Sequence, residues 1–168
     1  NNLRFFIENK VKCYGSEINN QMVNLCKENL KRFKIKTPII KIGTNENIDY
    51  KKNFFDLLVS INTIHYSYKN GLIKAVEEYS RVLKKGGIAI IETPKKNHTT
   101  VSKSEFISDF HFKWGPKGFR KYSDMGFVND EKKFVKILKK YFRKVETNYK
   151  IEKYAKFNLS NFVFVCQK

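Results

Sequence analysis

Two patterns of apolar residues alternate along the chain from Asn1 to Pro94. Short, nearly continuous apolar runs are typical of strands that are covered on both faces. Such runs lie at Ile39–Ile42, Phe54–Ile61 and Ile88–Glu92, and the segment Val11–Ile18 is interpreted as a further strand that ends in an acidic residue. Apolar residues that recur about every 3.6 positions predict helices instead. These segments lie at Asn1–Glu8, Asn20–Phe33 and Leu72–Lys84. The alternation predicts an α/β fold with a parallel sheet and helices on both of its faces.

The later part of the chain follows a less regular pattern. The stretch Lys95–Asp130 contains scattered glycines and no sustained period. Apolar residues at helical spacing then predict a helix over Glu131–Phe142, and strands are expected near Lys144–Ile151 and Asn161–Cys166. We expect these last two strands to lie at one edge of the sheet. Because the sequence contains no internal repeat or low-complexity linker, it favours a single domain over residues 1–168.

Net charge is the most unusual bulk property of the sequence. It contains 34 lysines and arginines against 16 aspartates and glutamates, which gives a formal net charge of +18 at pH 7. An anionic partner, nucleic acid or a phosphorylated substrate, is one explanation. The other is codon bias, because the abundant lysine, asparagine, isoleucine, phenylalanine and tyrosine all have A/T-rich codons. Arginine, which suits bidentate contacts to bases and phosphates, is scarce, so we favour codon bias and leave nucleic acid as an alternative partner.

The remaining composition limits the class of protein. A hydrophobic content of 41% with 15% aromatic residues is typical of a globular chain. No apolar run approaches the roughly 18 residues that span a bilayer, and no leader opens the chain, so we expect a cytoplasmic location. Cys13, Cys26 and Cys166 lack the spacing of metal ligands. We therefore expect reduced, buried thiols and no metal site.

Four local motifs follow one another along the chain. They are VKCYGSEIN from Val11, IKIGTNENIDY from Ile40, FFDLLVSINTIHYS from Phe54 and EEYSRVLKKGGIAIIE from Glu77. In this order they resemble class I, Rossmann-like S-adenosylmethionine-dependent methyltransferases. The last motif, similar to the family's "R-V-L-K-x-G-G" helix, turn and strand, is the most specific of the four. The resemblance extends over nearly the whole chain.

The resemblance implies a three-layer fold and a cofactor. The family's sheet is mostly parallel with an antiparallel C-terminal edge, and its methyl donor is S-adenosylmethionine. In the family a first strand leads into a glycine-rich loop around the methionine end of the cofactor, and nothing in Asn1–Lys10 resembles that loop. We therefore expect the strand between the Val11 and Phe54 strands to be absent from this sequence. Cofactor binding by this chain alone is left open.

Glu17 is the first candidate for cofactor binding. Ligands of parallel α/β sheets bind at the carboxyl ends of the strands, and a carboxylate there can accept hydrogen bonds from both ribose hydroxyls. The resemblance places Glu17 in this role and Ile18, the next residue, against the adenine. The alternatives are a polar strand exit for Glu17 and an ordinary core contact for Ile18.

Further cofactor contacts are implied at two later turns. Thr44 matches the position where the family often has an acid that contacts the adenine amino group, and Asn45 beside it offers an amide oxygen. A plain solvent-facing turn is an equal alternative. Ser60 and Asn62 follow the Phe54–Ile61 strand, where the resemblance implies backbone contacts to the methionine part. Gly86 and Gly87 are interpreted as structural, as a left-handed helix cap with close backbone packing.

His65 is the candidate catalytic residue, as a general base that removes a proton from the methyl acceptor. A histidine that only starts a helix or supports the site is the alternative that we favour. Many methyl transfers need no enzymic base, because the sulfonium is already activated and the protein mainly aligns the acceptor with the methyl group.

Aromatic residues concentrate in a segment over residues 95–130. They are Phe106, Phe110, Phe112, Trp114, Phe119, Tyr122 and Phe127, with His98 and His111 among them. A long irregular segment in a compact domain is often functional, and the resemblance places acceptor recognition here. We interpret the segment as a substrate-recognition or lid insertion. Core packing of a small accessory helix is an equal alternative.

These observations lead to one main hypothesis about function and two alternatives. The main hypothesis is S-adenosylmethionine-dependent methyl transfer to a small-molecule or glycan-precursor acceptor. An RNA methyltransferase is the first alternative, supported by charge but by no recognisable RNA-binding appendage. The second is a catalytically degenerate methyltransferase-fold domain that acts as a binding module. The acceptor, the attacked atom and the oligomeric state cannot be inferred from the sequence.

Overall fold

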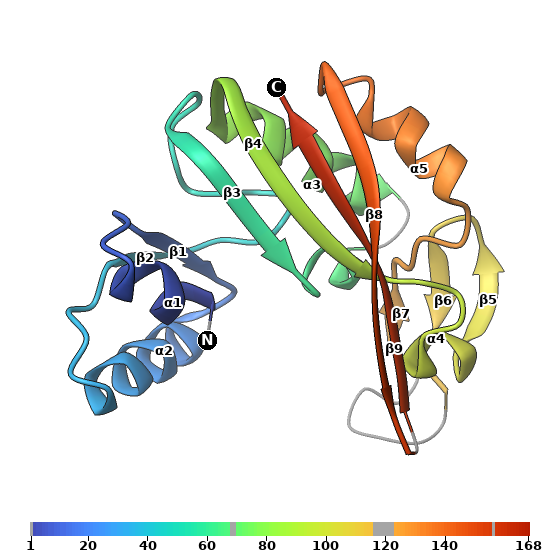
Figure 1. Ribbon diagram of the computed structural model, residues 1–168, viewed down its shortest axis with the longest axis horizontal. Coiled ribbons are helices and arrows are strands. Elements are labelled where there is room, and N and C mark those ends of the chain that lie inside the picture. Colours follow the sequence, from blue (N-terminus) through green and yellow to red (C-terminus); the bar gives the residue numbers. More distant parts are fainter. Residues whose placement is uncertain (1, 68–69, 116–122, 156) are drawn as a thin grey trace. The chain divides into compact units, whose positions relative to one another are not determined.

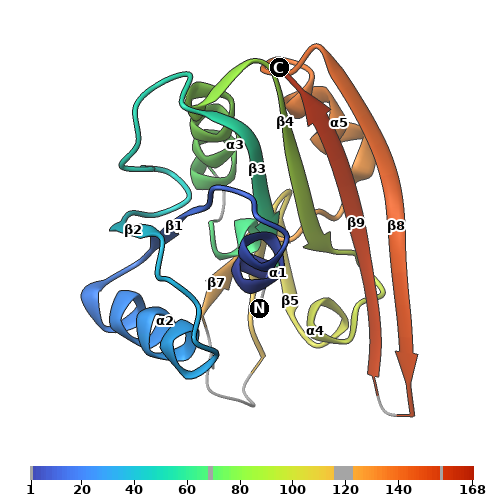
Figure 2. The same ribbon diagram turned by 60° about the vertical axis from the view of Figure 1, so that its left-hand side comes forward.

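The computed structural model describes residues 2–67, 70–115, 123–155 and 157–168. Contacts divide the chain into two compact units, an N-terminal unit over Asn1–Asp49 and a C-terminal unit over Tyr50–Lys168. Figures 1 and 2 show the elements of both units from two directions. Among the described residues no helix is long and apolar enough to cross a membrane.

The N-terminal unit consists of two helices and a pair of parallel strands. Its elements are α1 (Asn2–Glu8), β1 (Tyr14–Glu17), α2 (Asn20–Arg32) and β2 (Ile39–Ile42). Strands β1 and β2 run parallel in a register that pairs Tyr14 with Ile39 and Glu17 with Ile42. Asn19 begins α2 because its side chain accepts a hydrogen bond from the Met22 amide. All four elements were predicted from the sequence, although β1 is shorter than the predicted Val11–Ile18.

The C-terminal unit is built on a four-stranded mixed sheet in the order β3-β4-β9-β8. Its strands are β3 (Phe55–Ile61), β4 (Leu83–Pro94), β8 (Lys144–Tyr154) and β9 (Phe157–Gln167). Strand β4 is parallel to β3, whereas β9 is antiparallel to both of its neighbours. The predicted α/β fold with parallel strands and an antiparallel C-terminal edge is therefore confirmed.

Two helices cover one face of this sheet. Figures 1 and 2 show α3 (Asn70–Val82) and α5 (Glu131–Leu138) on the same side. The strand residues that face them are apolar and fully buried, as in Ile91 and Phe164. From α5, Phe134 packs edge-on against Phe164 at 5.0 Å between ring centroids. This face is the main core of the unit.

The segment after β4 is more ordered than the sequence indicated. It contains the short helix α4 (Thr99–Ser102) and a small antiparallel sheet. The strands of that sheet are β5 (Glu105–Ser108), β6 (His111–Lys113) and β7 (Asp124–Met125). Short strands of low apolar content leave little periodic signal, which explains why the sequence predicted only irregular structure here.

The predicted helix cap at Gly86 and Gly87 is wrong. Helix α3 ends at Val82 and β4 begins at Leu83, so both glycines lie within the strand. Gly86 has a φ of +80°, a conformation that suits glycine. A Cβ at Gly87 would lie 3.1 Å from the Asp56 carbonyl oxygen, so the predicted close backbone packing holds for this glycine.

Strands β1 and β3 each pair with one strand only in the part of the chain that the structure describes. These are the two strands between which the sequence predicts an absent neighbour. The absent strand itself stays a prediction.

Candidate functional site

The predicted cofactor residues fall into two groups, one in each unit. Glu17, Ile18, Thr44 and Asn45 lie at or just beyond the carboxyl ends of the parallel strands β1 and β2. Ser60 and Asn62 lie at the carboxyl end of β3, which is parallel to β4. Both groups therefore occupy the strand ends at which parallel α/β sheets bind ligands.

Glu17 presents a half-buried carboxylate at the end of β1. Its backbone oxygen accepts a hydrogen bond of 2.9 Å from the Gly43 amide, which joins the ends of β1 and β2. Within residues 2–49, no hydrogen bond or ion pair engages the carboxylate itself. Burial raises the pKa of the Cys26 thiol, and the negative charge of the nearby Glu17 carboxylate raises it further. Ile18 beside it leaves 64% of its surface exposed, an apolar surface next to a carboxylate without a partner.

A tight turn follows β2 and carries Thr44 and Asn45. Thr44 and Asn47 exchange two backbone hydrogen bonds of 3.1 and 3.3 Å, so the turn closes on itself. Gly43 permits this closure, because a Cβ there would lie 2.8 Å from both the Asn47 carbonyl oxygen and the Ser16 hydroxyl. The sequence analysis missed Gly43, although a glycine directly after an apolar strand was a usable signal. Thr44 is exposed and Asn45 is half-buried.

Ser60 is held by a buried hydrogen-bond network. Its hydroxyl lies 2.8 Å from the Thr63 hydroxyl and 2.9 Å from the Tyr79 hydroxyl on α3. The side chain therefore ties the end of β3 to α3. The backbone contact to the methionine part that the resemblance implies for Ser60 stays a prediction.

Asn62 connects β3 to the end of β4. Its φ of +52° places it in the left-handed region, which asparagine tolerates better than most residues. Its amide N–H donates to the Glu92 carbonyl at 2.9 Å, and its side-chain Nδ2 donates to Glu92 Oε1 at 3.4 Å. Asn62 therefore holds the loop after β3 against Glu92.

Glu92 is a functional candidate that the sequence analysis missed. It is only 5% exposed, although it carries a carboxylate. Asn161 Nδ2 donates to its Oε1 at 2.5 Å, and the Lys150 ammonium lies 3.8 Å from the same oxygen. A usable signal was present, because Glu92 ends an apolar parallel strand in the same way that Glu17 does.

His65 lies in a short 3₁₀ helix over Ile64–Tyr66 and is 5% exposed. Its ring stacks on Phe127 at 5.4 Å, and its carbonyl accepts a hydrogen bond of 2.7 Å from the Gly126 amide. These contacts anchor the segment after β7 to the loop after β3. The ring is enclosed in this arrangement, and both the supporting role and the role of general base stay predictions.

The aromatic segment divides into packed and exposed residues. Phe112, Phe127, Val101 and Met125 form a small buried cluster with Trp114 against it. Phe106 is 56% exposed. Phe119 and Tyr122 lie outside the described residues.

The two other histidines have structural contacts. His98 begins α4, and its Nδ1 accepts a hydrogen bond of 3.1 Å from the Thr100 amide. His111 Nε2 lies 2.5 Å from an Asp124 carboxylate oxygen, which joins β6 to β7. In the described ranges, no group of three or more histidines, cysteines or acids could hold a metal ion.

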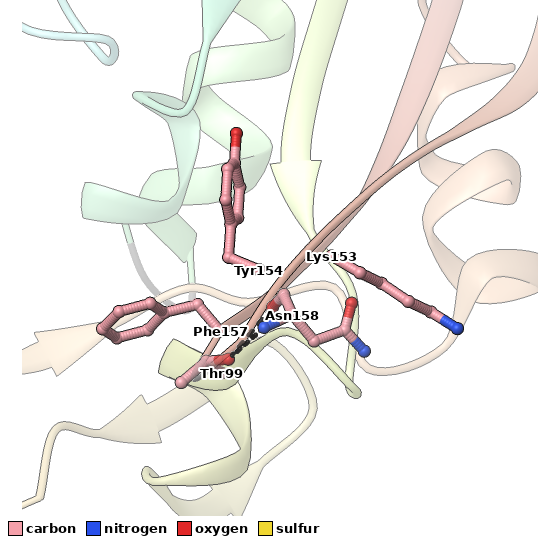
Figure 3. A pocket seen from close by; sticks show the side chains of 5 residues that line it. All are labelled: Thr99, Lys153, Tyr154, Phe157 and Asn158. Atoms are coloured by element: carbon pink, nitrogen blue, oxygen red, sulfur yellow. Dashed lines mark hydrogen bonds between the residues drawn. The ribbon is translucent and has the colours of Figure 1, made fainter.

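A shallow depression of about 330 Å³ lies near the end of the β8–β9 hairpin. Figure 3 shows the side chains that line it: Thr99, Lys153, Tyr154, Phe157 and Asn158. The Thr99 hydroxyl accepts from the Asn158 amide at 2.7 Å and donates to its carbonyl at 3.1 Å, so α4 is fixed to β9. The rings of Tyr154 and Phe157 are more than half exposed, which gives the depression an apolar side.

The most specific motif has a clear structural role. Arg81, within RVLKKGG, forms two hydrogen bonds of 2.6 and 2.8 Å with the Glu78 carboxylate and a third of 2.9 Å with the Tyr50 carbonyl. The carbonyls of Arg81 and Val82 accept from the amides of Asn53 and Phe54. The end of α3 thereby fixes the turn that leads into β3.

The adenosine part of S-adenosylmethionine fits the residues of the N-terminal unit. The carboxylate of Glu17 has no partner among residues 2–49 and suits a pair of ribose hydroxyls, which are donors. The exposed side chain of Ile18 suits the flat apolar face of adenine.

Comparisons with solved structures identify the fold. A protein from Pyrococcus horikoshii OT3 has a TM-score of 0.68 at 18% identity, with 98% of this chain and 76% of that chain covered. An S-adenosylmethionine-dependent methyltransferase from Methanosarcina mazei has a TM-score of 0.71 at 15% identity, with coverage of 92% and 81%. A possible histamine N-methyltransferase from Thermotoga maritima has a TM-score of 0.64 at 20% identity, with coverage of 98% and 77%.

A sequence search among curated proteins found no match. The family described as "Methyltransferase domain" matches residues 2–91, which is more than half of the chain and includes the first three motifs and the fourth as far as Ile91. The chain therefore belongs to the Methyltransferase domain family, as a class I enzyme whose cofactor is S-adenosylmethionine.

Proposed function

We propose that the protein transfers the methyl group of S-adenosylmethionine to a small-molecule or glycan-precursor acceptor. The observation that carries the proposal is the carboxylate of Glu17, which stands without a partner among residues 2–49 at the end of a parallel strand. A carboxylate in that place has the chemistry to accept two hydrogen bonds from a ribose.

The other cofactor contacts follow from the same placement. Ile18 packs against the adenine, while Thr44 and Asn45 meet its amino group from the turn that Gly43 closes. On the C-terminal unit, the backbone at Ser60 and Asn62 contacts the methionine part. The Ser60 hydroxyl holds the end of β3 in place through its hydrogen bonds to Thr63 and Tyr79.

The cofactor supplies a methyl group that is already activated by its sulfonium. The residues of the chain therefore mainly bind and orient the acceptor. A general base at His65 stays a prediction. Because the ring is enclosed beside Phe127, a direct proton transfer from the acceptor requires the ring to be uncovered first.

We assign acceptor recognition to the segment over residues 95–130. Its buried cluster fixes the segment, and the exposed Phe106 remains for contact with an acceptor. The similar protein from Thermotoga maritima, described as a possible histamine N-methyltransferase, supports an acceptor of small size.

The experiment compares S-adenosylmethionine binding by the full-length wild type, Glu17→Ala and the control Glu28→Ala, by titration calorimetry. Hydrogen bonds to a charged group contribute roughly 1.5–3 kcal/mol each, so we expect Glu17→Ala to weaken affinity at least about tenfold. Glu28, an exposed acid on α2, should leave affinity unchanged. Equal affinities for all three would remove Glu17 from the site.

A second measurement separates the enzyme from the alternatives. The full-length protein is incubated with S-adenosylmethionine labelled in its methyl group, together with small-metabolite and RNA fractions. Label in the metabolite fraction supports the proposal, and label in RNA supports the first alternative. A wild type that binds no cofactor supports the degenerate binding module.

A further inference from the structure

The end of β4 carries a carboxylate in an unusual environment. Glu92 is 5% exposed, and both hydrogen bonds to its side chain, from Asn62 and Asn161, go to the same oxygen, Oε1. Within the described ranges, the second oxygen, Oε2, has no hydrogen-bond donor. A buried carboxylate is costly unless its charge is compensated, so this arrangement needs a positive group.

The two amides that hold Glu92 add further acceptors. Each donates one of its two side-chain N–H groups to Glu92, and the Oδ1 atoms of both Asn62 and Asn161 are buried without a hydrogen-bond partner among the described residues. Asn161 is 3% exposed, so solvent does not replace the missing donor. Among the described residues, the cluster of Glu92, Asn62 and Asn161 therefore offers three oxygens without a hydrogen-bond donor: Glu92 Oε2 and the two Oδ1 atoms.

The nearby basic side chains compensate this charge only weakly. The Lys150 ammonium lies 3.8 Å from Glu92 Oε1, beyond hydrogen-bond distance, and its side chain is 46% exposed. Because solvent reaches the ammonium and it makes no hydrogen bond to the carboxylate, Lys150 compensates the charge of Glu92 only in part. His98 faces the same carboxylate, but burial lowers the pKa of its imidazole, so at neutral pH it brings no charge.

We propose that the Glu92 cluster binds a positively charged, N–H-rich nitrogen group of the methyl acceptor, such as an ammonium. The inference rests on the proposed function, because it narrows the small-molecule acceptor to one that carries a cationic nitrogen. An ammonium supplies three donors and one positive charge, which match the three acceptor oxygens and the single carboxylate. An anionic acceptor would place like charges together.

The experiment uses two probes of the same shape that differ in charge, butylamine and butanol. Both are titrated into the isotope-labelled full-length protein at neutral pH without S-adenosylmethionine. Nitrogen–proton correlation spectra follow the side-chain amide signals of Asn62 and Asn161. We expect butylamine to shift both signals in a saturable way and butanol to leave them in place.

Three variants test the source of the effect. Glu92→Gln keeps the shape and removes the charge, so the apparent Kd for butylamine should rise at least about tenfold. Lys150→Gln removes the competing cation and should lower that Kd. Glu146→Gln, a change on an exposed acid of the same sheet that pairs with Lys144, should leave it unchanged.

The outcomes separate this inference from the proposed function. If butylamine shifts neither amide in the wild type, or if butanol shifts them equally, the inference is overturned even where S-adenosylmethionine binds. If butylamine binds but S-adenosylmethionine does not, the inference that the Glu92 cluster binds a cationic nitrogen holds and the proposed function is wrong. The wild-type comparison of the two probes needs no variant, so it decides the matter even if Glu92→Gln does not fold.

Discussion

The two units of the chain bury very different amounts of apolar surface. Among the described residues, the N-terminal unit has three buried apolar side chains, Val23, Leu30 and Ile48, whereas the C-terminal unit has 22. Large apolar side chains of the N-terminal unit are instead exposed, among them Phe5, Ile18 and Ile39. Stability is therefore expected to reside in the C-terminal unit, while the candidate ribose ligand, Glu17, belongs to the weakly packed one.

This difference separates what holds the fold from what recognises a ligand. Arg81, within the most specific motif, connects α3 to the turn before β3 through its hydrogen bonds to the Glu78 carboxylate and the Tyr50 carbonyl. Glu17 is joined to its unit by a backbone hydrogen bond to Gly43, and within residues 2–49 its carboxylate makes no hydrogen bond or ion pair. Substitutions in the two units should therefore affect different measurements, stability in one and ligand binding or side-chain reactivity in the other.

The largest effect is expected for Phe134→Ala in the C-terminal unit. Phe134 is fully buried and contacts both Phe110 and Phe164, at ring distances of 5.9 and 5.0 Å. Loss of such a ring leaves a cavity, so the free energy of unfolding should fall by about 3–5 kcal/mol. Urea denaturation measures it.

The matched control is Phe33→Ala in the N-terminal unit. Phe33 is 53% exposed and carries the Arg4 guanidinium 4.1 Å above its ring. Its loss should cost less than about 1 kcal/mol, the range of an exposed cation–π contact. Equal losses for Phe134→Ala and Phe33→Ala would contradict the contrast between the units.

The fold was largely predictable because its regular elements carry strong periodic signals. The parallel strands are short apolar runs, and α2 and α3 show apolar residues at helical spacing. The start of β4 was missed because Gly86 and Gly87 resemble a helix cap in sequence, and only the pairing of Phe55 with Leu83 shows that a strand has already begun. The β5–β7 sheet was missed because its strands are two to four residues long.

The candidate site was predictable only where one strand end defines it. Glu17 was identified because it ends a predicted strand within a known motif order. Glu92 ends a similar run, but its importance depends on Asn161, 69 positions later, which β9 brings beside the end of β4. A pairing of that sequence separation leaves no signal in a single sequence.

A smaller effect is expected for Arg81→Ala. The substitution removes both bonds to Glu78 and the bond to the Tyr50 carbonyl. The Arg81 side chain is 35% exposed, so solvent weakens these interactions and the loss in unfolding free energy should be about 1–2 kcal/mol. Arg81→Lys should recover only part of it, because lysine lacks the planar fork. No change in denaturation midpoint for Arg81→Ala would show that the motif does not stabilise the C-terminal unit.

A pH-dependent effect is expected at His98. Burial lowers its pKa below the ordinary 6.5, an effect that the Glu92 carboxylate partly opposes. The unfolded chain therefore takes up a proton before the folded chain does, so the stabilising contribution is complete above about pH 6.5 and is lost as the pH falls below it. His98→Asn keeps an acceptor for the Thr100 amide. Its melting temperature should decline less below this pH than that of the wild type, and identical profiles would contradict the assignment.

The smallest effect is expected in the rates at which the cysteine thiols of the two units react. All three cysteines are free, but Cys166 is fully buried in the C-terminal unit, where burial raises its pKa to about 12. Cys13 and Cys26 are only half-buried, contrary to the expectation that all three are buried. A thiol reagent applied to the native protein should therefore modify Cys13 and Cys26 first, as peptide mass spectrometry would show, because the thiolate is the reactive form.

In Glu17→Ala the pKa of Cys26 should fall slightly, since one of the two causes that raise it is removed, and Cys26 should react faster while Cys13 keeps its rate. An unchanged Cys26 rate would place the Glu17 carboxylate away from α2, and early modification of Cys166 would show that the C-terminal unit opens as readily as the N-terminal one.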